Sequence, residues 1–269
     1  MDPLKEAAAI KSEVSRVIAS TAYQTYEKRL LKEVKEHTVP HHVAVIMDGN
    51  RRFAKEFGLT PTEGHIKGKD KLEEVLDWCM ELGVKVLTVY AFSTENFDRD
   101  LDEVDSLMQM FEDNFYRLAK DERVHRHGIR VRVLGQRELL PDNVIRAIEV
   151  AESATAEYSN FYYNLATAYG SRQEIIHAIK QIAKQVKSGN LDVEDIDERT
   201  FSSYLYTADL PDPDLILRTS GEERISNFLL WQLAYSELYF TDVYWPGFRK
   251  IDLLRAFRSY QMRQRRFGK

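Results

Sequence analysis

The feature that most constrains the fold of this chain is a regular alternation of apolar runs with amphipathic segments. Residues 42–47 and 84–92 form apolar runs that end in polar clusters, as buried strands of a parallel sheet do. Between them, the apolar residues of segment 64–82 recur at spacings of three and four, which predicts a helix. Because the alternation repeats about six times, it predicts an α/β fold with a central, mostly parallel six-stranded sheet flanked by helices.

The same patterns predict the remaining elements. Strands are expected at 129–134, 161–169, 215–217 and 238–244, and helices at 101–118, 141–158, 173–186, 227–236 and 252–265, with an acidic helix or turn at 192–198. An amphipathic helix over 4–36 ends before Pro40. Since no linker interrupts residues 37–269, we expect them to form a single domain behind an N-terminal helical extension over 1–36.

Composition excludes several classes of protein. Of the 269 residues, 43% are hydrophobic and 30% are charged, a balance typical of soluble globular proteins. The single cysteine, Cys79, excludes an internal disulfide and a Cys-x-x-Cys metal site, and it fits a reducing compartment. The net charge of −5 argues against a nucleic-acid partner. No apolar run reaches the roughly 18 residues of a membrane span, and no signal peptide is evident. These properties favour the cytoplasm.

The strongest local signal is the stretch Asp48-Gly49-Asn50-Arg51-Arg52, directly after the first predicted strand. A carboxylate in this position suits Mg²⁺, which binds one or two carboxylates together with substrate phosphate oxygens. Gly49 allows close backbone approach to a ligand, a helix that starts at Asn50 favours an anion, and the two arginines add charged donors. The structural alternative is a capping aspartate with two solvated arginines.

Two further polar clusters also come directly after predicted strands. Residues 93–99 read STENFDR, and the segment that begins at Arg218 reads RTSGEERIS. The second cluster, with two arginines, nearby hydroxyls and a flexible glycine, suits a diphosphate, although ordinary surface loops can have this composition. Functional loops of open α/β sheets lie at the carboxyl ends of strands, where all three clusters are expected.

Three other features leave two interpretations open. His65 near a helix start is either incidental or functional. Glu237, in an apolar stretch, needs a partner, which can be a structural cation or a metal. Residues 249–269 carry a net charge of +7, which fits a solvated helix end or a contact with phosphate or an anionic surface.

These residues together resemble the cis-prenyltransferase family, the undecaprenyl and dehydrodolichyl diphosphate synthases. The resemblance spans about residues 42–268 and rests on the stretches HVAVIMDGNRRFAKEFGL, GHIKGKDKL, VYAFSTENFDRDLDEVDSLM, RTSGEERISNFLLWQLAYSELYFTDVYWP and the terminal RRFG. The form DGNRRFA is more similar to archaeal and eukaryotic members than to bacterial ones.

The resemblance implies a Mg²⁺-dependent prenyl transfer. Isopentenyl diphosphate would condense repeatedly with an allylic diphosphate, geranylgeranyl or farnesyl diphosphate, to give a long-chain polyprenyl diphosphate, the precursor of a glycosyl carrier lipid. By resemblance, Asp48 and Asn96 are catalytic, and Asp48 and Glu237 bind the metal. The residues that would bind the substrates are Gly49, Asn50, Arg51, Arg52, Phe53, His65, Ser93, Thr94, Glu95, Phe97, Arg99, Arg218, Arg224, Ile225, Ser226, Arg266 and Gly268.

The resemblance also implies a homodimer, in which the terminal Arg266-Phe267-Gly268 reaches the partner's site and Glu237 lies near the interface. The helices at 64–82 and 101–119 would wall an apolar tunnel beside the sheet, and peripheral membrane contact would serve product release. One residue departs from the pattern of many bacterial members, which have an arginine where this chain has Pro61. Arg51 is a candidate to replace the diphosphate contact of that arginine. Two alternatives remain: a transferase with a short or non-sequentially coupled product, and a non-catalytic subunit of a two-protein synthase.

Overall fold

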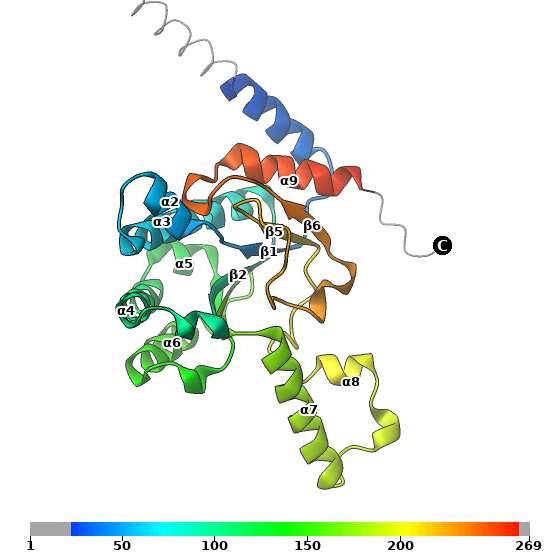
Figure 1. Cartoon of the computed structure of the whole chain (residues 1–269). Coiled ribbons are helices and arrows are strands. Elements are labelled where there is room, and N and C mark those ends of the chain that lie inside the picture. The colour runs from blue at the N-terminus through cyan, green and yellow to red at the C-terminus, as the bar shows by residue number, and fades with distance from the viewer. Residues whose placement is uncertain (1–22, 264–269) are drawn as a thin grey trace, which may run out of the picture. The chain divides into compact units, whose positions relative to one another are not determined.

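The computed structural model describes residues 23–263, and this part of the chain holds one six-stranded sheet (Figure 1). The sheet has the order β3-β4-β2-β1-β5-β6, and all five pairings are parallel. The predicted α/β fold is therefore confirmed. The strands are β1 (His42–Ile46), β2 (Val86–Ser93), β3 (Ile129–Leu134), β4 (Phe161–Tyr169), β5 (Leu215–Arg218) and β6 (Glu237–Phe240).

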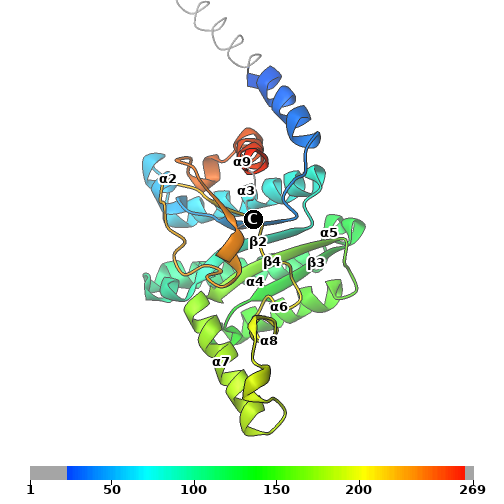
Figure 2. The same ribbon diagram turned by 90° about the vertical axis from the view of Figure 1, so that its right-hand side faces the viewer.

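Helices connect and flank the strands (Figure 2). They are α2 (Asn50–Glu56), α3 (Pro61–Leu82), α4 (Leu101–Leu118), α5 (Glu122–His127), α6 (Asp142–Thr155), α7 (Ser171–Lys187) and α8 (Glu198–Ser202). One further helix, α9 (Lys250–Met262), follows the last strand in the sequence. Short 3₁₀ helices are η1 (Thr94–Asp98), η2 (Arg137–Leu139), η3 (Val193–Asp195), η4 (Gln232–Tyr235) and η5 (Trp245–Gly247). Helix α3 starts at a capping box, in which Glu63 N donates to Thr60 Oγ1 at 3.2 Å.

The helix predicted over 227–236 is wrong, because only η4 forms there. Asn227 and Leu229 have positive φ angles of 63° and 48°, which interrupt a right-handed helix. This segment instead bonds to the start of α7: Ser171 N donates to Asn227 O at 2.8 Å, and Leu230 N donates to Ser171 Oγ at 2.9 Å. Tertiary hydrogen bonds have therefore overridden the local helical pattern.

The chain starts the sheet in its middle. After β1 it forms β2 beside β1, then β3 at the edge of the sheet and β4 between β2 and β3, and it returns to add β5 and β6 on the other side of β1. The order of the strands therefore reverses at β1, and open α/β sheets bind ligands at such a switch point, outside the carboxyl ends of the strands. The polar clusters after β1, β2 and β5 all lie at this edge.

The described residues form two compact units. Residues 40–248 hold the whole sheet, and residues 23–39 with 249–263 form the second unit. Within the second unit, residues 23–35 are helical, and Gln261 of α9 donates its Nε2 hydrogen to Val34 O at 2.9 Å. The rest of the predicted 4–36 helix, and Arg266 to Gly268, lie outside the described residues. Within 23–263, no helix combines the length and apolar character that crossing a bilayer requires.

Three buried polar side chains form a chain of hydrogen bonds across the centre of the sheet. His42 Nδ1 lies 2.7 Å from Pro211 O, a carbonyl that can only accept, so Nδ1 carries the proton. His42 Nε2 then accepts from Thr88 Oγ1 at 2.8 Å, and Thr88 Oγ1 accepts from Asn164 Nδ2 at 3.0 Å. Burial lowers the pKa of His42 to about 4, which keeps the ring neutral.

We therefore expect acid to destabilise the fold through His42. In the unfolded chain His42 has a pKa near 6.5, whereas in the folded chain its pKa is about 4. Between these two pH values only the unfolded chain binds the proton. The free energy of unfolding therefore falls by about 2 kcal/mol between pH 7.5 and pH 5.0. Urea unfolding of the wild type and His42→Asn at both pH values checks this. The loss on acidification should be clearly smaller in the variant, and equal losses would contradict the role of His42.

Candidate active site

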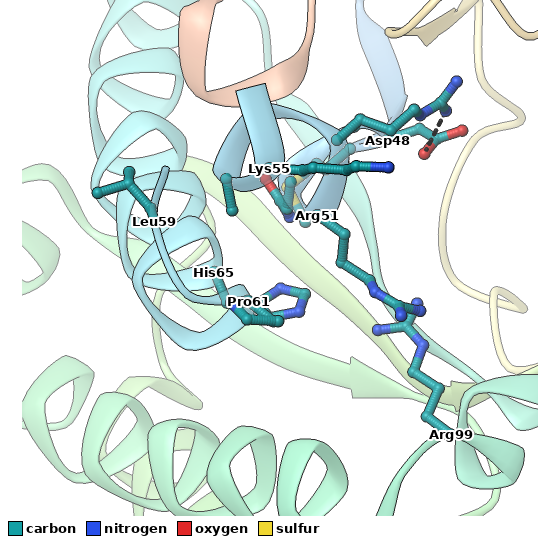
Figure 3. A pocket seen from close by; sticks show the side chains of 12 residues that line it. Asp48, Arg51, Lys55, Leu59, Pro61, His65 and Arg99 are labelled. Carbon is teal, nitrogen blue, oxygen red and sulfur yellow. Dashed lines mark ion pairs between the residues drawn. The ribbon is translucent and has the colours of Figure 1, made fainter. Parts of the chain in front are cut away.

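Asp48 lies just beyond β1 (Figure 3). Contacts from distant segments fix it there. Its Oδ2 accepts a hydrogen bond from Arg218 Nη2 at 2.7 Å, and its Oδ1 pairs with Arg52 Nη2 at 3.1 Å. Its backbone oxygen accepts from Thr219 Oγ1 at 2.7 Å and from Trp245 N at 3.0 Å. Both the carboxylate and the backbone of Asp48 are therefore held in place.

Asp48 is ionised at neutral pH. Burial by itself would raise the pKa of its carboxyl group, but the hydrogen bonds and charges of Arg218 and Arg52 outweigh this effect and lower the pKa below its usual value. The side chain remains 26% exposed, so a ligand can reach it. The result is an accessible carboxylate between two arginines.

Gly49 makes the turn from β1 into α2 possible. Its φ of 105° is in the left-handed region, and a Cβ atom there would lie 2.9 Å from Tyr244 Cδ1 and 3.1 Å from Ser220 Cβ. Both conformation and space therefore require glycine. The turn positions Arg52, whose Nη2 donates to Ser220 Oγ at 2.6 Å and whose Nη1 pairs with Glu222 Oε1 at 3.0 Å.

Arg218 ends β5 and is buried, with 4% of its surface exposed. Its Nη1 donates to the backbone oxygen of Arg224 and, at 2.8 Å, to Ser226 Oγ. Within the described residues its buried Nε has no hydrogen-bond partner. Ser220 and Ser226 adopt positive φ angles of 78° and 45°, so the loop around this guanidinium is strained. Such strain is typical of functional loops.

The cluster after β2 folds into η1, which orients Asn96. Ser93 N donates to Asn96 Oδ1 at 3.1 Å. Because a backbone N–H can only donate, this contact engages the amide oxygen and leaves the Asn96 NH₂ group as the one that can serve a ligand. Phe97 packs edge-on against Phe92, with ring centroids 4.8 Å apart, and this anchors η1 to the sheet.

Two cavities meet at Asp48, and both are also lined by Met47, Asn50, His65 and Arg99. The first, of about 670 Å³, has the further lining residues Gly49, Arg51, Arg52, Ala54, Lys55, Leu59 and Pro61 (Figure 3). The second, of about 570 Å³, has the further lining residues Ile46, Tyr90, Ala91, Ser93, Glu95, Asn96, Leu107, Arg218, Arg224, Ser226 and Asn227. Their charged lining is mostly basic, with Arg51, Arg52, Lys55, Arg99, Arg218 and Arg224 against Asp48 and Glu95. Both cavities therefore favour anions.

The structure separates some predicted site residues from these cavities. Phe53, Thr94, Phe97 and Ile225 lie in the same segments but line neither cavity. Glu237 lies at the amino end of β6, paired with Leu215, whereas Arg218 pairs with Phe240 at the carboxyl end. At a rise of about 3.3 Å per residue, that distance along the strand is roughly 10 Å. Arg266 and Gly268 lie outside the described residues.

Sequence reasoning missed Glu103, which organises the first cavity. Its Oε1 accepts from Arg99 Nη1 at 3.0 Å and from His65 Nε2 at 3.1 Å, and its Oε2 lies 3.7 Å from Arg51 Nε. Figure 3 shows Arg51 and Arg99 extending toward each other, and Glu103 offsets their repulsion. Burial lowers the pKa of His65, so the ring is neutral at neutral pH and donates Nε2–H to Glu103. The signal in the sequence was the four-residue spacing from Arg99.

A second acidic residue, Glu222, was also missed. It pairs with Arg52 at 3.0 Å and bonds to Arg224, and thus links arginines of the two cavities. Both Glu103 and Glu222 hold arginines in position, and a diphosphate carries enough negative charge to compete for the same donors. Their roles depend on side chains far away in sequence, which a local motif does not reveal.

The donor set fits Mg²⁺ shared with a phosphate ligand. Within residues 23–263, no group of three or more His, Cys, Asp or Glu side chains could by itself enclose a metal ion. Asp48 instead presents one ionised carboxylate to two basic cavities. Mg²⁺ is commonly held in this way, by one or two carboxylates and substrate phosphate oxygens.

Comparison with known proteins finds one family. The sequence profile described as "Putative undecaprenyl diphosphate synthase" matches residues 46–268. The tritrans,polycis-undecaprenyl-diphosphate synthase (geranylgeranyl-diphosphate specific) of Methanopyrus kandleri is 59% identical over 254 residues, 94% of each chain. The protein of the same name from Pyrococcus horikoshii is 54% identical over 260 residues, 97% of this chain and 98% of that one.

Two solved structures have a similar fold. Lavandulyl diphosphate synthase from Lavandula x intermedia, in complex with dimethylallyl diphosphate, is 40% identical with a TM-score of 0.81, over 86% of this chain and 99% of that one. A structure described as "a probable undecaprenyl diphosphate synthase" from Campylobacter jejuni is 33% identical with a TM-score of 0.69, over 86% of this chain and 100% of that one.

The close fit around Gly49 predicts a large effect of adding one methyl group. Gly49→Ala should lower the free energy of unfolding by roughly 2–4 kcal/mol, because left-handed strain adds to the contacts with Tyr244 and Ser220. Gly58→Ala is the matched control: its φ is +66°, but nothing lies within 4 Å of the new Cβ, so only conformational strain remains. Urea unfolding of both variants measures the difference, and equal losses would show that the space around Gly49 is not limiting.

Proposed function

We infer the function from one premise: the chain belongs to the undecaprenyl diphosphate synthase family, the cis-prenyltransferases. It is a prenyltransferase. The activity in the names of its relatives, undecaprenyl-diphosphate synthesis, is consistent with cis-prenyl chain elongation. We propose that it adds isopentenyl units to geranylgeranyl diphosphate, the specificity in the names of the M. kandleri and P. horikoshii proteins. The observation that carries this proposal is the meeting of two basic cavities at the ionised carboxylate of Asp48.

Each cavity would bind one diphosphate. Following the family resemblance, the allylic diphosphate lies in the first cavity, with Arg51, Arg52 and His65. Arg51 takes over the diphosphate contact of the arginine that many bacterial members have at the position of Pro61. Isopentenyl diphosphate lies in the second cavity, on Arg218, Arg224 and Ser226. The partnerless Nε of Arg218 and the exposed face of Asp48 support ligand binding between them. Fixing both diphosphates at neighbouring sites orients the isopentenyl double bond toward the allylic carbon.

The reaction breaks the allylic C–O bond and forms a C–C bond to the isopentenyl double bond. Negative charge then develops on the departing diphosphate, and Arg51 and Arg52 are already in place to stabilise it. When bound to Asp48 and the diphosphates, Mg²⁺ would supply further stabilisation of this charge. Asp48 holds Arg218 and Arg52 in a fixed relation across the two cavities.

One proton must leave the isopentenyl group after the new bond forms. Asn96 is a poor candidate for the base, because an amide is weakly basic and its oxygen already accepts from Ser93 N at 3.1 Å. We assign Asn96 the role of orienting a substrate through its NH₂ group, and the proton passes to a diphosphate oxygen. Repetition of the cycle yields a long polyprenyl diphosphate, the proposed precursor of a glycosyl carrier lipid.

A homodimer would complete the site. β6 is an edge strand whose four residues are only partly buried, and the nearby Tyr235 is 76% exposed, which supports a partner surface at this edge. As the family resemblance implies, Glu237 would bind the metal ion near that surface. Arg266 and Gly268 would reach the partner's diphosphates. We place the enzyme in the cytoplasm, with peripheral membrane contact for the release of an apolar product.

Turnover of labelled isopentenyl diphosphate with geranylgeranyl diphosphate and MgCl₂ tests the proposal. The purified wild type should form long polyprenyl products, whereas Asp48→Asn should lose two to three orders of magnitude in rate, roughly 3–4 kcal/mol in the barrier. Asparagine retains an oxygen for Arg218 but not the charge, so the fold should persist, whereas alanine would leave a buried guanidinium unpaired.

The exposed helix cap Asp197 provides the matched control, because Asp197→Asn keeps the cap of α8 and should retain full activity. Near-normal turnover by folded Asp48→Asn would contradict the assignment of Asp48. A short or branched product from the wild type would favour a related transferase, and no turnover by the chain alone would favour a non-catalytic subunit.

A further inference from the structure

The segment that follows β6 is bonded to both loops that carry the site. Ser220 N, in the loop after β5, donates to Val243 O at 2.9 Å. Two residues later, Trp245 N donates to Asp48 O, in the turn after β1, at 3.0 Å. Tyr244 lies between these two hydrogen bonds. Its backbone is therefore fixed from both sides by the loops whose side chains line the cavities.

The ring of Tyr244 has two neighbours in the turn after β1. A Cβ atom on Gly49 would lie 2.9 Å from Tyr244 Cδ1, so the ring packs closely against the backbone of the turn. The guanidinium of Arg52 lies over the ring, with its Cζ atom 5.8 Å from the ring centroid. At a distance within about 6 Å, the electron-rich face of a tyrosine attracts such a cation. Tyr244 therefore contacts one face of the Arg52 side chain.

The other contacts of Arg52 lie at the edge of its guanidinium. Its Nη2 pairs with Asp48 Oδ1 at 3.1 Å and donates to Ser220 Oγ at 2.6 Å. Its Nη1 pairs with Glu222 Oε1 at 3.0 Å and donates to Ser220 O at 3.3 Å. Because all the N–H groups of a guanidinium lie in its plane, a diphosphate would compete with these oxygens for the same donors. It would not compete with the ring of Tyr244, which contacts the face.

We propose that Tyr244 is a positioning residue for the allylic diphosphate, because its ring holds the face of the Arg52 guanidinium while the diphosphate takes over the donors at the edge. This inference rests on the proposed function, which places that diphosphate beside Arg52 in the first cavity. The Arg52 side chain is 40% exposed, so without the ring a guanidinium that has left Glu222 could turn toward solvent. Within residues 23–263, Tyr244 is not among those that line either cavity, so it acts through Arg52.

Ligand binding by Tyr244→Leu and Tyr244→Phe tests the proposal. Leucine removes the aromatic face but keeps an apolar side chain beside Gly49, whereas phenylalanine keeps the face. Tyr26→Leu is the matched control, because Arg255 Cζ lies over the Tyr26 ring at 5.7 Å and neither residue lines the two cavities. Calorimetric titration with MgCl₂ present measures the Kd of unreactive geranylgeranyl thiolodiphosphate and, separately, of isopentenyl diphosphate.

Tyr244→Leu should raise the Kd of the allylic analogue about 3- to 10-fold and leave that of isopentenyl diphosphate unchanged. Tyr244→Phe and Tyr26→Leu should bind both ligands as the wild type does. Thermal unfolding shows which variants are folded, and Tyr244→Met replaces Tyr244→Leu if the leucine variant is not. An unchanged Kd for the analogue, an equal rise for both ligands, or the same loss in Tyr244→Phe would overturn the positioning role.

The variant Arg52→Met shows whether Tyr244 acts through the cation. Methionine places no charge over the ring, so in the Arg52→Met background Tyr244→Leu should change the Kd of the analogue by less than about twofold. A loss as large as in the wild-type background would mean that the ring acts in another way, and would overturn the proposal. Either failure leaves the proposed function intact, whereas a wild type that forms no elongated product from geranylgeranyl and isopentenyl diphosphates would overturn both.

Discussion

The site depends on the ion pair between Asp48 and Arg218. Arg218 is 4% exposed, and a buried guanidinium without its carboxylate would be strongly destabilising. Since β1 and β5 are adjacent, with Ile46 opposite Arg218, this pair joins the ends of the two strands at which the order of the sheet reverses. Asp48 lines both cavities, whereas Arg218 lines only the second, so the pair fixes a wall that the two cavities share.

Acidic side chains hold the surrounding arginines ready for anions. Glu103 contacts Arg51, Arg99 and His65, and Glu222 contacts Arg52 and Arg224. Without these carboxylates, like charges would repel across the cavities and the arginine side chains would be less ordered. The same principle applies at the other end of α3, where Glu73 holds two arginines, but there the network adjoins apolar rather than diphosphate-sized space.

Local patterns could predict the strands and the polar clusters at their carboxyl ends, because a buried parallel strand is apolar on both faces and its loop carries the function. They could not predict the irregular segment after Ser226, since its positive φ angles at Asn227 and Leu229 are supported by hydrogen bonds to Ser171, far away in sequence. Glu103 was missed for the same reason: two of its partners lie on α2 and α3. Long-range contacts therefore determine what local propensity leaves open.

The most direct measurement of the central claim is a crystal structure with an unreactive geranylgeranyl thiolodiphosphate, isopentenyl diphosphate and Mg²⁺ bound together. The account predicts one diphosphate beside Arg51 and Arg52, the other beside Arg218 and Arg224, and the Asp48 carboxylate between them. Density for both diphosphates in one cavity, or for either one remote from Asp48, would contradict it.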